Sequence, residues 1–325
     1  MWLLSGRCRS RARLDGKTAV VTGANCGVGK ETALDFVRRG ARVIMACRDM
    51  KKAEDAAADI RLQTKGSEGA GMVEVVQLDL ASLASVRKCA QHLLDTQTRI
   101  HILVNNAGVC FYPKAVTEDG FEMHMAVNHF GHFLLTCLLL PRIIRSGTAR
   151  IVIVASSFHY VAKRIHFEDL HWEKRQYSAF KSFAESKLAN VLISAELARR
   201  LKGTQVSTYS LHPGLVASEA ARYMDTTWFR GAQWFHDKVL ARFIKTPEQG
   251  AQTSIHCAVC EETAYDTGLY YRDCKISSCK SLVNDTVLLQ KFWEESAHLV
   301  GLGDWNPFTA EDTGILPQEI ITVRL

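Results

Sequence analysis

The chain has 325 residues and a mildly basic net charge of +6, and its 47% of apolar and 23% of charged residues are ordinary for a soluble globular protein. Because no long basic stripe is present, this charge argues against a nucleic-acid-binding protein. The ten cysteines have no regular spacing, which excludes a disulfide framework, and no apolar run approaches the roughly 20 residues that cross a bilayer.

Apolar, β-branched runs alternate with stretches of helical periodicity along most of the chain. In chain order we predict a strand at 17–22, helix at 29–39, strand at 42–46, helix at 51–63, strand at 73–78, helix at 83–94, strand at 100–104, helix at 121–145, strand at 150–154, helix at 180–201 and strand at 206–211. Such alternation is typical of a parallel sheet with helices on both faces. The sequence therefore predicts an α/β fold with a doubly wound parallel sheet.

The chain is predicted to hold a single domain, at residues 15–300, because no repeat, linker or low-complexity segment divides it. Residues 1–14 are predicted as a basic leader outside the domain, and residues 301–325 as an irregular C-terminal tail that is mobile or lies on the surface. The leader resembles a mitochondrial presequence but is short for one. We expect a cytoplasmic protein, with association to a membrane or to mitochondria as alternatives.

A glycine-rich loop follows the first predicted strand, and a helix follows the loop at once. In this context Gly23 permits a tight turn, Gly27 lets the backbone approach a pyrophosphate, and Gly29 allows close packing of helix on strand. The N-terminus of the helix then offers unpaired N–H groups to the phosphates. The loop predicts a Rossmann-type dinucleotide site, to which we also assign Asn25 and Val28.

The end of the second predicted strand indicates which dinucleotide binds. NAD-dependent enzymes usually place an acid there to accept the ribose hydroxyls. This chain has Arg48 instead, which suits a 2′-phosphate through charge-assisted hydrogen bonds, and the side chain of the following Asp49 is expected to point away. We therefore predict NADP(H) rather than NAD(H).

Several motifs make residues 15–300 resemble the short-chain dehydrogenase/reductase family. Thr22–Gly29 resembles its TGxxxGxG loop and Asn105–Gly108 its NNAG motif. The resemblance implies that Asp79 and Leu80 hold the adenine ring, that Asn106 supports the nicotinamide side, that Pro213 and Gly214 lie beside the carboxamide, and that Asn128, Ser157 and Lys187 belong to the catalytic tetrad. Residues 119–124, 128–136, 186–190 and 245–253 resemble the branch that contains the retinol dehydrogenases.

The position of the family's catalytic tyrosine is occupied by Phe183, four residues before Lys187. In the family, the lysine and the oxidised nicotinamide lower the pKa of the phenol, which then exchanges a proton with the substrate oxygen. Phe183 has the ring without the hydroxyl. A proton could instead come from Lys187 through a water or from Ser157, and Tyr160 and Tyr177 are weaker candidates because neither has helical spacing to Lys187.

Two functions follow from these residues. The first is an NADP(H)-dependent oxidoreductase in which Asn128 holds a water relay, Ser157 orients the substrate oxygen and Lys187 binds the nicotinamide ribose. The second is a non-catalytic NADP(H)-binding protein that acts as a sensor or partner-binding module. The resemblance favours the first, and the missing hydroxyl favours the second.

Aromatic residues recur at helical spacing in the segment from Tyr223 to Phe243, including Trp228, Phe235 and Phe243. In the family the segment after the Pro-Gly pair forms a lid over the substrate, and an apolar lid suits a retinoid-, steroid- or fatty-like alcohol or carbonyl. A peripheral membrane contact and a core stripe are alternatives. The resemblance also implies a homodimer through the helices that carry Asn128 and Lys187.

No metal site is predicted. Cys257, Cys260, Cys274 and Cys279 lack a histidine pair at ligand spacing, and the pair His129 and His132 lacks a third ligand. We interpret these two histidines as structural.

Overall fold

A computed structural model describes residues 5–216 and 244–316, and all statements below refer to these residues. They contain one eight-stranded sheet with the strand order β3-β2-β1-β4-β5-β6-β7-β8. The strands are β1 (Thr18–Thr22), β2 (Arg42–Cys47), β3 (Met72–Gln77), β4 (Ile102–Asn105), β5 (Ala149–Val154), β6 (Val206–His212), β7 (Leu269–Arg272) and β8 (Lys275–Ile276). The strand order reverses between β1 and β4, and ligands of such sheets bind beyond the carboxyl ends of the strands at this point.

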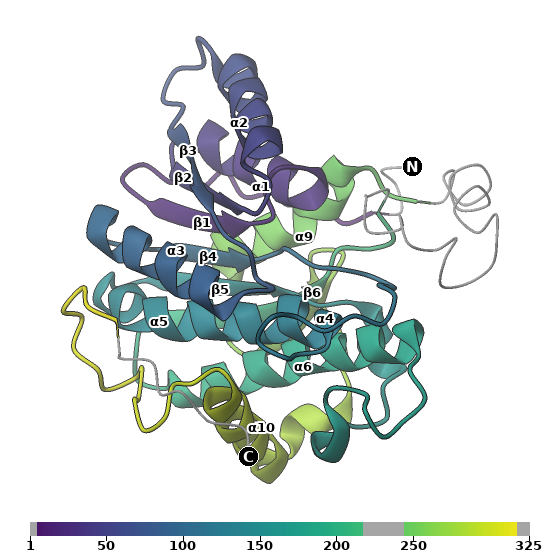
Figure 1. The fold of residues 1–325 in the computed structure, drawn as a ribbon. Coiled ribbons are helices and arrows are strands. Elements are labelled where there is room, and N and C mark those ends of the chain that lie inside the picture. The colour runs from purple at the N-terminus through teal and green to yellow at the C-terminus, as the bar shows by residue number, and fades with distance from the viewer. Residues whose placement is uncertain (1–4, 217–243, 317–325) are drawn as a thin grey trace.

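Helices cover both faces of the sheet (Figure 1). They are α1 (Gly27–Arg38), α2 (Met50–Thr64), α3 (Leu83–Thr96), α4 (Met123–Met125), α5 (Gly131–Arg145), α6 (Ala179–Arg200), α9 (Pro247–Val259) and α10 (Thr286–Leu299). Alternate strand residues face opposite sides. Val20 and Ile44 pack in the core beneath α3, α5 and α6, while Val21 and Met45 pack in the core beneath α1, α2 and α9.

The predicted α/β fold with a doubly wound sheet of Rossmann type is confirmed. Two details differ from the prediction. β8 pairs with β7 in the antiparallel direction, so the sheet is mostly rather than wholly parallel. The helix predicted at 121–145 is divided, because α4 leads into a π-helical segment, Ala126–Phe130, before α5 begins at Gly131.

The stretch Met123–Arg145 is long and apolar enough to cross a membrane by length and composition alone. However, 89% of its most apolar stretch is buried inside the protein, as in the core helix of a globular protein. It lies between the sheet and the outer helices, where residues such as Phe133 and Leu139 pack in the core.

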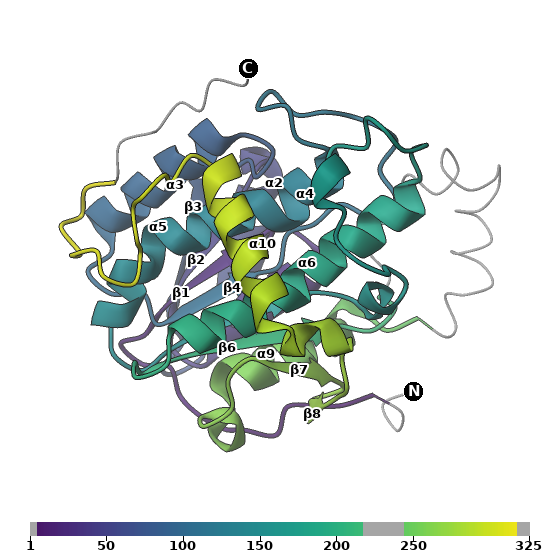
Figure 2. The ribbon, with the colours of Figure 1, turned by 90° about the horizontal axis from the view of Figure 1, so that it is seen from below.

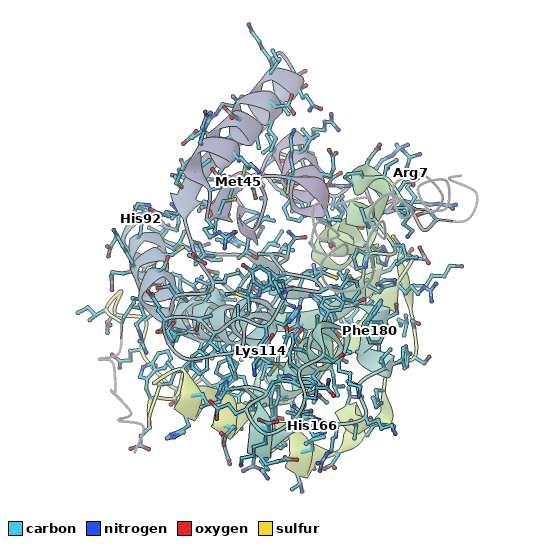
Figure 3. The ribbon with its side chains drawn as sticks, turned by 45° about the vertical axis from the view of Figure 1, so that its right-hand side comes forward. Arg7, Met45, His92, Lys114, His166 and Phe180 are labelled. Carbon is cyan, nitrogen blue, oxygen red and sulfur yellow. The ribbon has the colours of Figure 1, made fainter. Side chains whose placement is uncertain are left out.

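The described part of the leader contacts the folded body, although the sequence analysis placed it outside the domain. Leu14 is buried, Cys8 and Ala12 pack against the core beneath α9, and the backbone N–H of Cys8 donates to Gln252 on α9. Arg7 accordingly lies beside this helix (Figure 3). The arginine side chains of this segment, at positions 7, 9, 11 and 13, are exposed to solvent.

The described part of the tail, up to residue 316, has no helix or strand and lies along the surface of α3 and α5. Asp312 pairs with Arg142 and Arg145, and the carbonyl of Gly314 accepts from Gln91. These contacts hold the described part of the tail against α3 and α5, and the assignment of residues 301–325 to an irregular tail stays a prediction.

Helix α10 covers the outer side of α5 and α6 (Figure 2). Its Phe292 stacks on His129 at 4.8 Å, and its Trp293 meets Phe133 edge to face at the same distance. The sequence predicts a homodimer through the helices that carry Asn128 and Lys187. Because α10 of the same chain covers these helices, the structure favours a monomer, and the homodimer stays a prediction.

We therefore expect the protein to be a monomer in solution, since pairing α5 and α6 with a second copy would require α10 to leave its apolar contacts. Sedimentation velocity at micromolar concentration measures this directly. A dimer whose contacts map to α5 and α6 by cross-linking would contradict the expectation.

Candidate functional site

The glycine-rich loop between β1 and α1 has the shape that a pyrophosphate requires. Gly23 and Gly27 have φ angles of +63° and +57°, in the left-handed region that favours glycine. A Cβ on Gly29 would lie 2.5 Å from the carbonyl oxygen of Gly23, so helix and strand approach too closely for any side chain. The roles predicted for the three glycines agree with this backbone.

The N-terminus of α1 offers N–H groups, because its N-cap residue, Cys26, makes no side-chain capping hydrogen bond. In contrast, Asp49 caps α2 by accepting from the backbone of Lys52 at 3.1 Å. This capping also orients the Asp49 carboxylate toward α2, as expected. Arg48 is exposed at the end of β2, and its guanidinium has no partner within residues 5–216 and 244–316. A cation and a free helix terminus are thus available together for phosphate groups.

A buried hydrogen-bond network joins the glycine loop to the end of β4. The Thr22 hydroxyl accepts from the backbone N–H of Asn106 at 2.9 Å and of Ala107 at 3.0 Å. The Asn106 amide donates to the Thr22 carbonyl at 2.9 Å. On its other side, the Thr22 hydroxyl lies 2.8 Å from Nε2 of His132 on α5. Asn106 therefore holds the two loops that meet at the predicted dinucleotide site.

His132 was interpreted as structural from the sequence, and its contacts explain its position. Burial lowers the pKa of His132 to about 3, so the imidazole is neutral. Its Nδ1 lies 3.3 Å from the backbone carbonyl of Asn128, in the π-helical segment. His129 points elsewhere, with Nε2 2.9 Å from the hydroxyl of Ser296 on α10. The two rings thus have separate partners.

Asp79 and Leu80 follow β3, which is separated from β1 by β2 in the sheet order. The Asp79 carboxylate accepts from the backbone of Ala81 at 2.9 Å, which fixes the turn. Leu80 contacts the start of α5, where a Cβ on Gly131 would lie 2.5 Å from the Leu80 carbonyl oxygen. Gly131 was not singled out by sequence reasoning, although its close approach to the segment after β3 requires a glycine.

Asn128 lies in the π-helical segment and is fully buried. Its side-chain oxygen accepts from the backbone N–H of Val109 at 2.8 Å, and its amide donates to the Ser186 hydroxyl on α6 at 2.9 Å. Asn128 therefore connects the segment after β4 to the helix that carries Lys187. Single π turns of this kind occur often at functional sites.

Lys187 and Phe183 share one face of α6, as their spacing predicts. The ammonium of Lys187 is buried, donates to the carbonyl of Val154 at 3.0 Å and lies 5.7 Å from the centre of the Phe183 ring. Burial lowers the pKa of Lys187 to about 8. Phe183 packs edge to face against Phe111 and Phe158, each at 5.3 Å. Phe180, one turn earlier on α6, packs against the same cluster.

Ser157 begins a short 3-10 helix, Ser157–Tyr160, after β5, and its neighbour across the sheet is the end of β6. Its hydroxyl lies 3.4 Å from Nε2 of His212. Pro213 and Gly214 follow His212. Gly214 has a φ of +97°, and a Cβ there would meet the side chain of Lys245 at 2.6 Å. Sequence reasoning did not single out His212, and only its position before the Pro-Gly pair could have drawn attention to it.

The two tyrosines considered as substitutes for the missing hydroxyl point away from Lys187. The hydroxyl of Tyr160 donates to the carbonyl of Ser278. The hydroxyl of Tyr177 donates to the carbonyl of Tyr112 at 2.8 Å, and burial beside Glu122 raises the pKa of this tyrosine. In this arrangement neither hydroxyl reaches the Lys187 side of α6.

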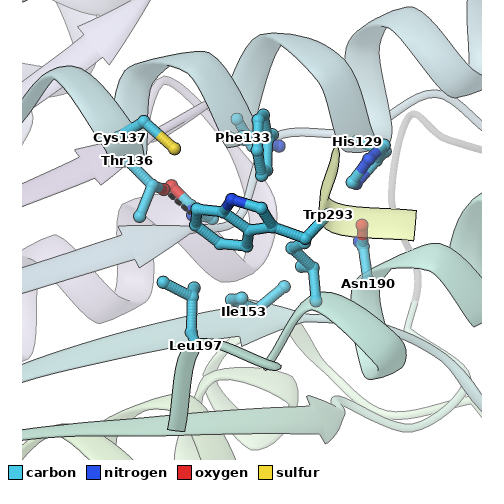
Figure 4. A pocket seen from close by; sticks show the side chains of 11 residues that line it. His129, Phe133, Thr136, Cys137, Ile153, Asn190, Leu197 and Trp293 are labelled. Carbon is cyan, nitrogen blue, oxygen red and sulfur yellow. Dashed lines mark hydrogen bonds between the residues drawn. The ribbon is translucent and has the colours of Figure 1, made fainter. Parts of the chain in front are cut away.

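A pocket lies between the sheet and helices α5, α6 and α10, and His132 is among the residues that line it (Figure 4). The Trp293 indole projects into it between Phe133 and Leu197 (Figure 4), and Asn105 and Asn190 also line it. It is a gap in side-chain packing behind the site. The aromatic segment from Tyr223 to Phe243, predicted as a substrate lid, lies outside the described residues.

Comparison with known proteins gives the same family that the motifs indicate. A family model described as "short chain dehydrogenase" matches residues 17–227. Human retinol dehydrogenase 11 is 46% identical over 300 residues, which cover 92% of this chain and 91% of that protein. Human retinol dehydrogenase 13 is 43% identical over 301 residues, which cover 93% of this chain and 89% of that protein.

Solved structures share the fold. An uncharacterised protein from Mycobacterium paratuberculosis superposes with a TM-score of 0.71 at 33% identity, covering 91% of this chain and 98% of that one. A protein from Beutenbergia cavernae, described as an NAD(P)-dependent gluconate 5-dehydrogenase with NADP bound at low occupancy, superposes with a TM-score of 0.61 at 26% identity, covering 80% and 96%.

Proposed function

The chain belongs to the short-chain dehydrogenase family of oxidoreductases, and we propose that it acts with NADP(H) on an apolar alcohol or carbonyl compound. Members of this family bind NAD(H) or NADP(H). The single observation that carries the choice of cofactor is the unpartnered Arg48 at the end of β2. The relation to the retinol dehydrogenases supports an apolar substrate of retinoid, steroid or fatty type.

The residues present fit the cofactor. The positive φ angles of Gly23 and Gly27, the absence of a side-chain cap on α1 and the free guanidinium of Arg48 make room and charge for a phosphorylated dinucleotide. Asn25 and Val28 lie in the same loop, Asp79 and Leu80 would bind the adenine end, and Asn106, Pro213 and Gly214 the nicotinamide end. When bound, the cofactor supplies the carbon that donates or accepts a hydride.

The chain's own residues orient the substrate and handle the proton. Ser157 directs its hydroxyl at the substrate oxygen, and Lys187 binds the nicotinamide ribose through its buried ammonium. Asn128 holds the segment after β4 against α6 and keeps a water relay in place beside Lys187. Phe183 provides an apolar wall at the substrate's reacting end, and takes no part in proton transfer because a phenyl ring has no exchangeable proton.

Replacement of Arg48 by Ala is expected to raise the Kd for NADPH by about tenfold to a hundredfold, because a charge-assisted hydrogen bond contributes about 1.5–3 kcal/mol. The Kd for NADH, which has no 2′-phosphate, is expected to change less than threefold, on the order of 0.5 kcal/mol. Quenching of tryptophan fluorescence measures both constants. Lys202→Ala, which removes an equally exposed cation after α6, is the matched control; equal losses for both nucleotides would contradict the assignment of Arg48.

Turnover with NADPH and a panel of retinoid, steroid and aliphatic carbonyls tests the function as a whole. We expect the unmodified chain to form product and the Lys187→Ala variant to form none. If the unmodified chain binds NADPH but shows no turnover, and the Phe183→Tyr variant is active, the result would instead support the sensor or partner-binding role. Failure to bind NADPH would overturn both.

A further inference from the structure

Ser157 has an imidazole partner that the family motifs do not mark. The chain leaves β5 at Val154, which pairs in the sheet with Leu211 of β6. This register brings Ser157, after β5, to the residue that ends β6, and Nε2 of His212 lies 3.4 Å from the Ser157 hydroxyl. Distances between catalytic groups are often long without substrate and shorten in the reacting complex.

The rest of the His212 side chain is enclosed by protein. The residue is 5% exposed, and its Nδ1 has no hydrogen-bond partner in the described part of the chain. A buried polar atom without a partner destabilises a fold by about 1–3 kcal/mol. An apolar residue at this position would avoid this destabilisation. We therefore expect the imidazole to have a function.

The surroundings keep this imidazole neutral. Burial, together with the nearby cations of Arg272 and Lys245, lowers the pKa of His212 to about 4, although Asp273 acts in the opposite direction. With its proton on Nδ1, the neutral ring presents a lone pair on Nε2 to the Ser157 hydroxyl. The pair then has the arrangement of a hydroxyl activated by an adjacent base.

Within residues 5–216 and 244–316, the other groups near Phe183 do not take the role of the tyrosine. The Phe183 ring packs edge to face with Phe111 and Phe158, and Lys187 already donates to the carbonyl of Val154. Tyr160 and Tyr177 bond elsewhere. The Ser157 hydroxyl is therefore the group that can exchange a proton with the substrate oxygen directly. This exchange requires a neighbouring base that accepts the proton of the hydroxyl.

We propose that His212 acts through Ser157 as the base of a proton relay that replaces the tyrosine of this family. During oxidation of an alcohol, its hydride passes to the nicotinamide, its O–H proton passes to Ser157 Oγ, and the proton of Ser157 passes to Nε2 of His212. The products are the carbonyl compound, the reduced cofactor and an imidazolium. After the carbonyl leaves, the imidazolium releases its proton to water by the same path, and reduction follows these steps in reverse. The relay rests on the proposed oxidoreductase function.

A double-mutant cycle with His212→Gln and Phe183→Tyr tests the relay. In the unmodified background, H212Q is expected to lower kcat by about tenfold or more. In the F183Y background it is expected to lower kcat by less than about threefold, because the phenol then supplies the proton. A purely structural role would reduce kcat equally in both backgrounds and would overturn the relay. His256→Gln, which removes another buried histidine from α9, is the control and is expected to leave both backgrounds within about threefold.

A second measurement needs no variant at position 212. The kcat of the unmodified chain is measured in mixtures of light and heavy water. A plot of kcat against the deuterium fraction is expected to be curved, because two protons move together. A straight line would overturn the relay. His212→Asn replaces H212Q if the latter does not fold. Lack of turnover in the unmodified chain, with activity in F183Y, would refute the proposed function and the relay together; turnover with equal effects of H212Q would refute the relay alone.

Discussion

Replacing Phe183 by Tyr is expected to raise kcat by about 10²-fold, the lower end of what a positioned acid–base group contributes. The new hydroxyl would stand on the same face of α6 as Lys187, whose ammonium lies 5.7 Å from the present ring centre. That cation would lower the pKa of the phenol and prepare it to exchange a proton with the substrate oxygen. The gain stays at the lower end because the relay through Ser157 already provides part of the proton transfer.

The measurement is steady-state turnover with saturating NADPH and a retinoid or steroid carbonyl. Phe180→Tyr is the matched control, since Phe180 belongs to the same aromatic cluster but lies one turn earlier on α6. Its variant is expected to stay within about threefold of the unmodified chain. An F183Y variant that binds NADPH normally and gains no activity would show that Phe183 does not stand where the phenol is needed.

Replacing Trp293 by Ala is expected to lower the free energy of unfolding by about 3–5 kcal/mol, as for other buried tryptophans. Trp293 is 5% exposed and joins three elements. Its indole meets Phe133 of α5 edge to face at 4.8 Å and lies 5.3 Å from Phe308 in the tail. The guanidinium of Arg200, at the end of α6, lies 4.8 Å from its ring centre. The variant would leave a cavity continuous with the existing pocket.

Urea unfolding followed by circular dichroism measures this loss. Val287→Ala on the same helix is the control, because Val287 is 77% exposed and its loss is expected to change stability by less than about 0.5 kcal/mol. Equal, small effects of the two substitutions would mean that α10 does not pack on α5 and α6 as described. A cooperative loss with W293A alone would support the single-chain coverage of this face.

The sheet and the dinucleotide loop were predictable because they depend on local patterns. Each of these signals is local in sequence and spans only a few residues. They are the apolar runs of the strands, the spacing of Gly23, Gly27 and Gly29, and the position of Arg48 after β2. The spacing of Phe183 and Lys187 likewise follows from the period of one helix. Their surroundings in the structure agree with these expectations, while the catalytic roles of the residues stay predictions.

The missed features depend on contacts between distant parts of the chain. His212 meets Ser157 only because β5 and β6 are neighbours in register, which no local pattern records. The position of α10 on α5 was equally hidden, since the apolar residues of both helices fit a homodimer interface as well as an intramolecular one. The π turn at Asn128 interrupts a continuous helical pattern. Gly131, which follows the turn, is tolerated inside a helical pattern, so periodicity alone predicted an unbroken helix.

Transfer of deuterium from the cofactor to the product shows whether the chain is an active NADP(H)-dependent oxidoreductase. The unmodified chain is supplied with NADPH deuterated at the transferable position of the nicotinamide and with an apolar aldehyde, and the alcohol is analysed by mass spectrometry. Incorporation of one deuterium per alcohol, abolished in Lys187→Ala, is the result that an active NADP(H)-dependent oxidoreductase predicts. NADPH that remains bound and fully deuterated, with no labelled alcohol from any member of the substrate panel, would contradict it.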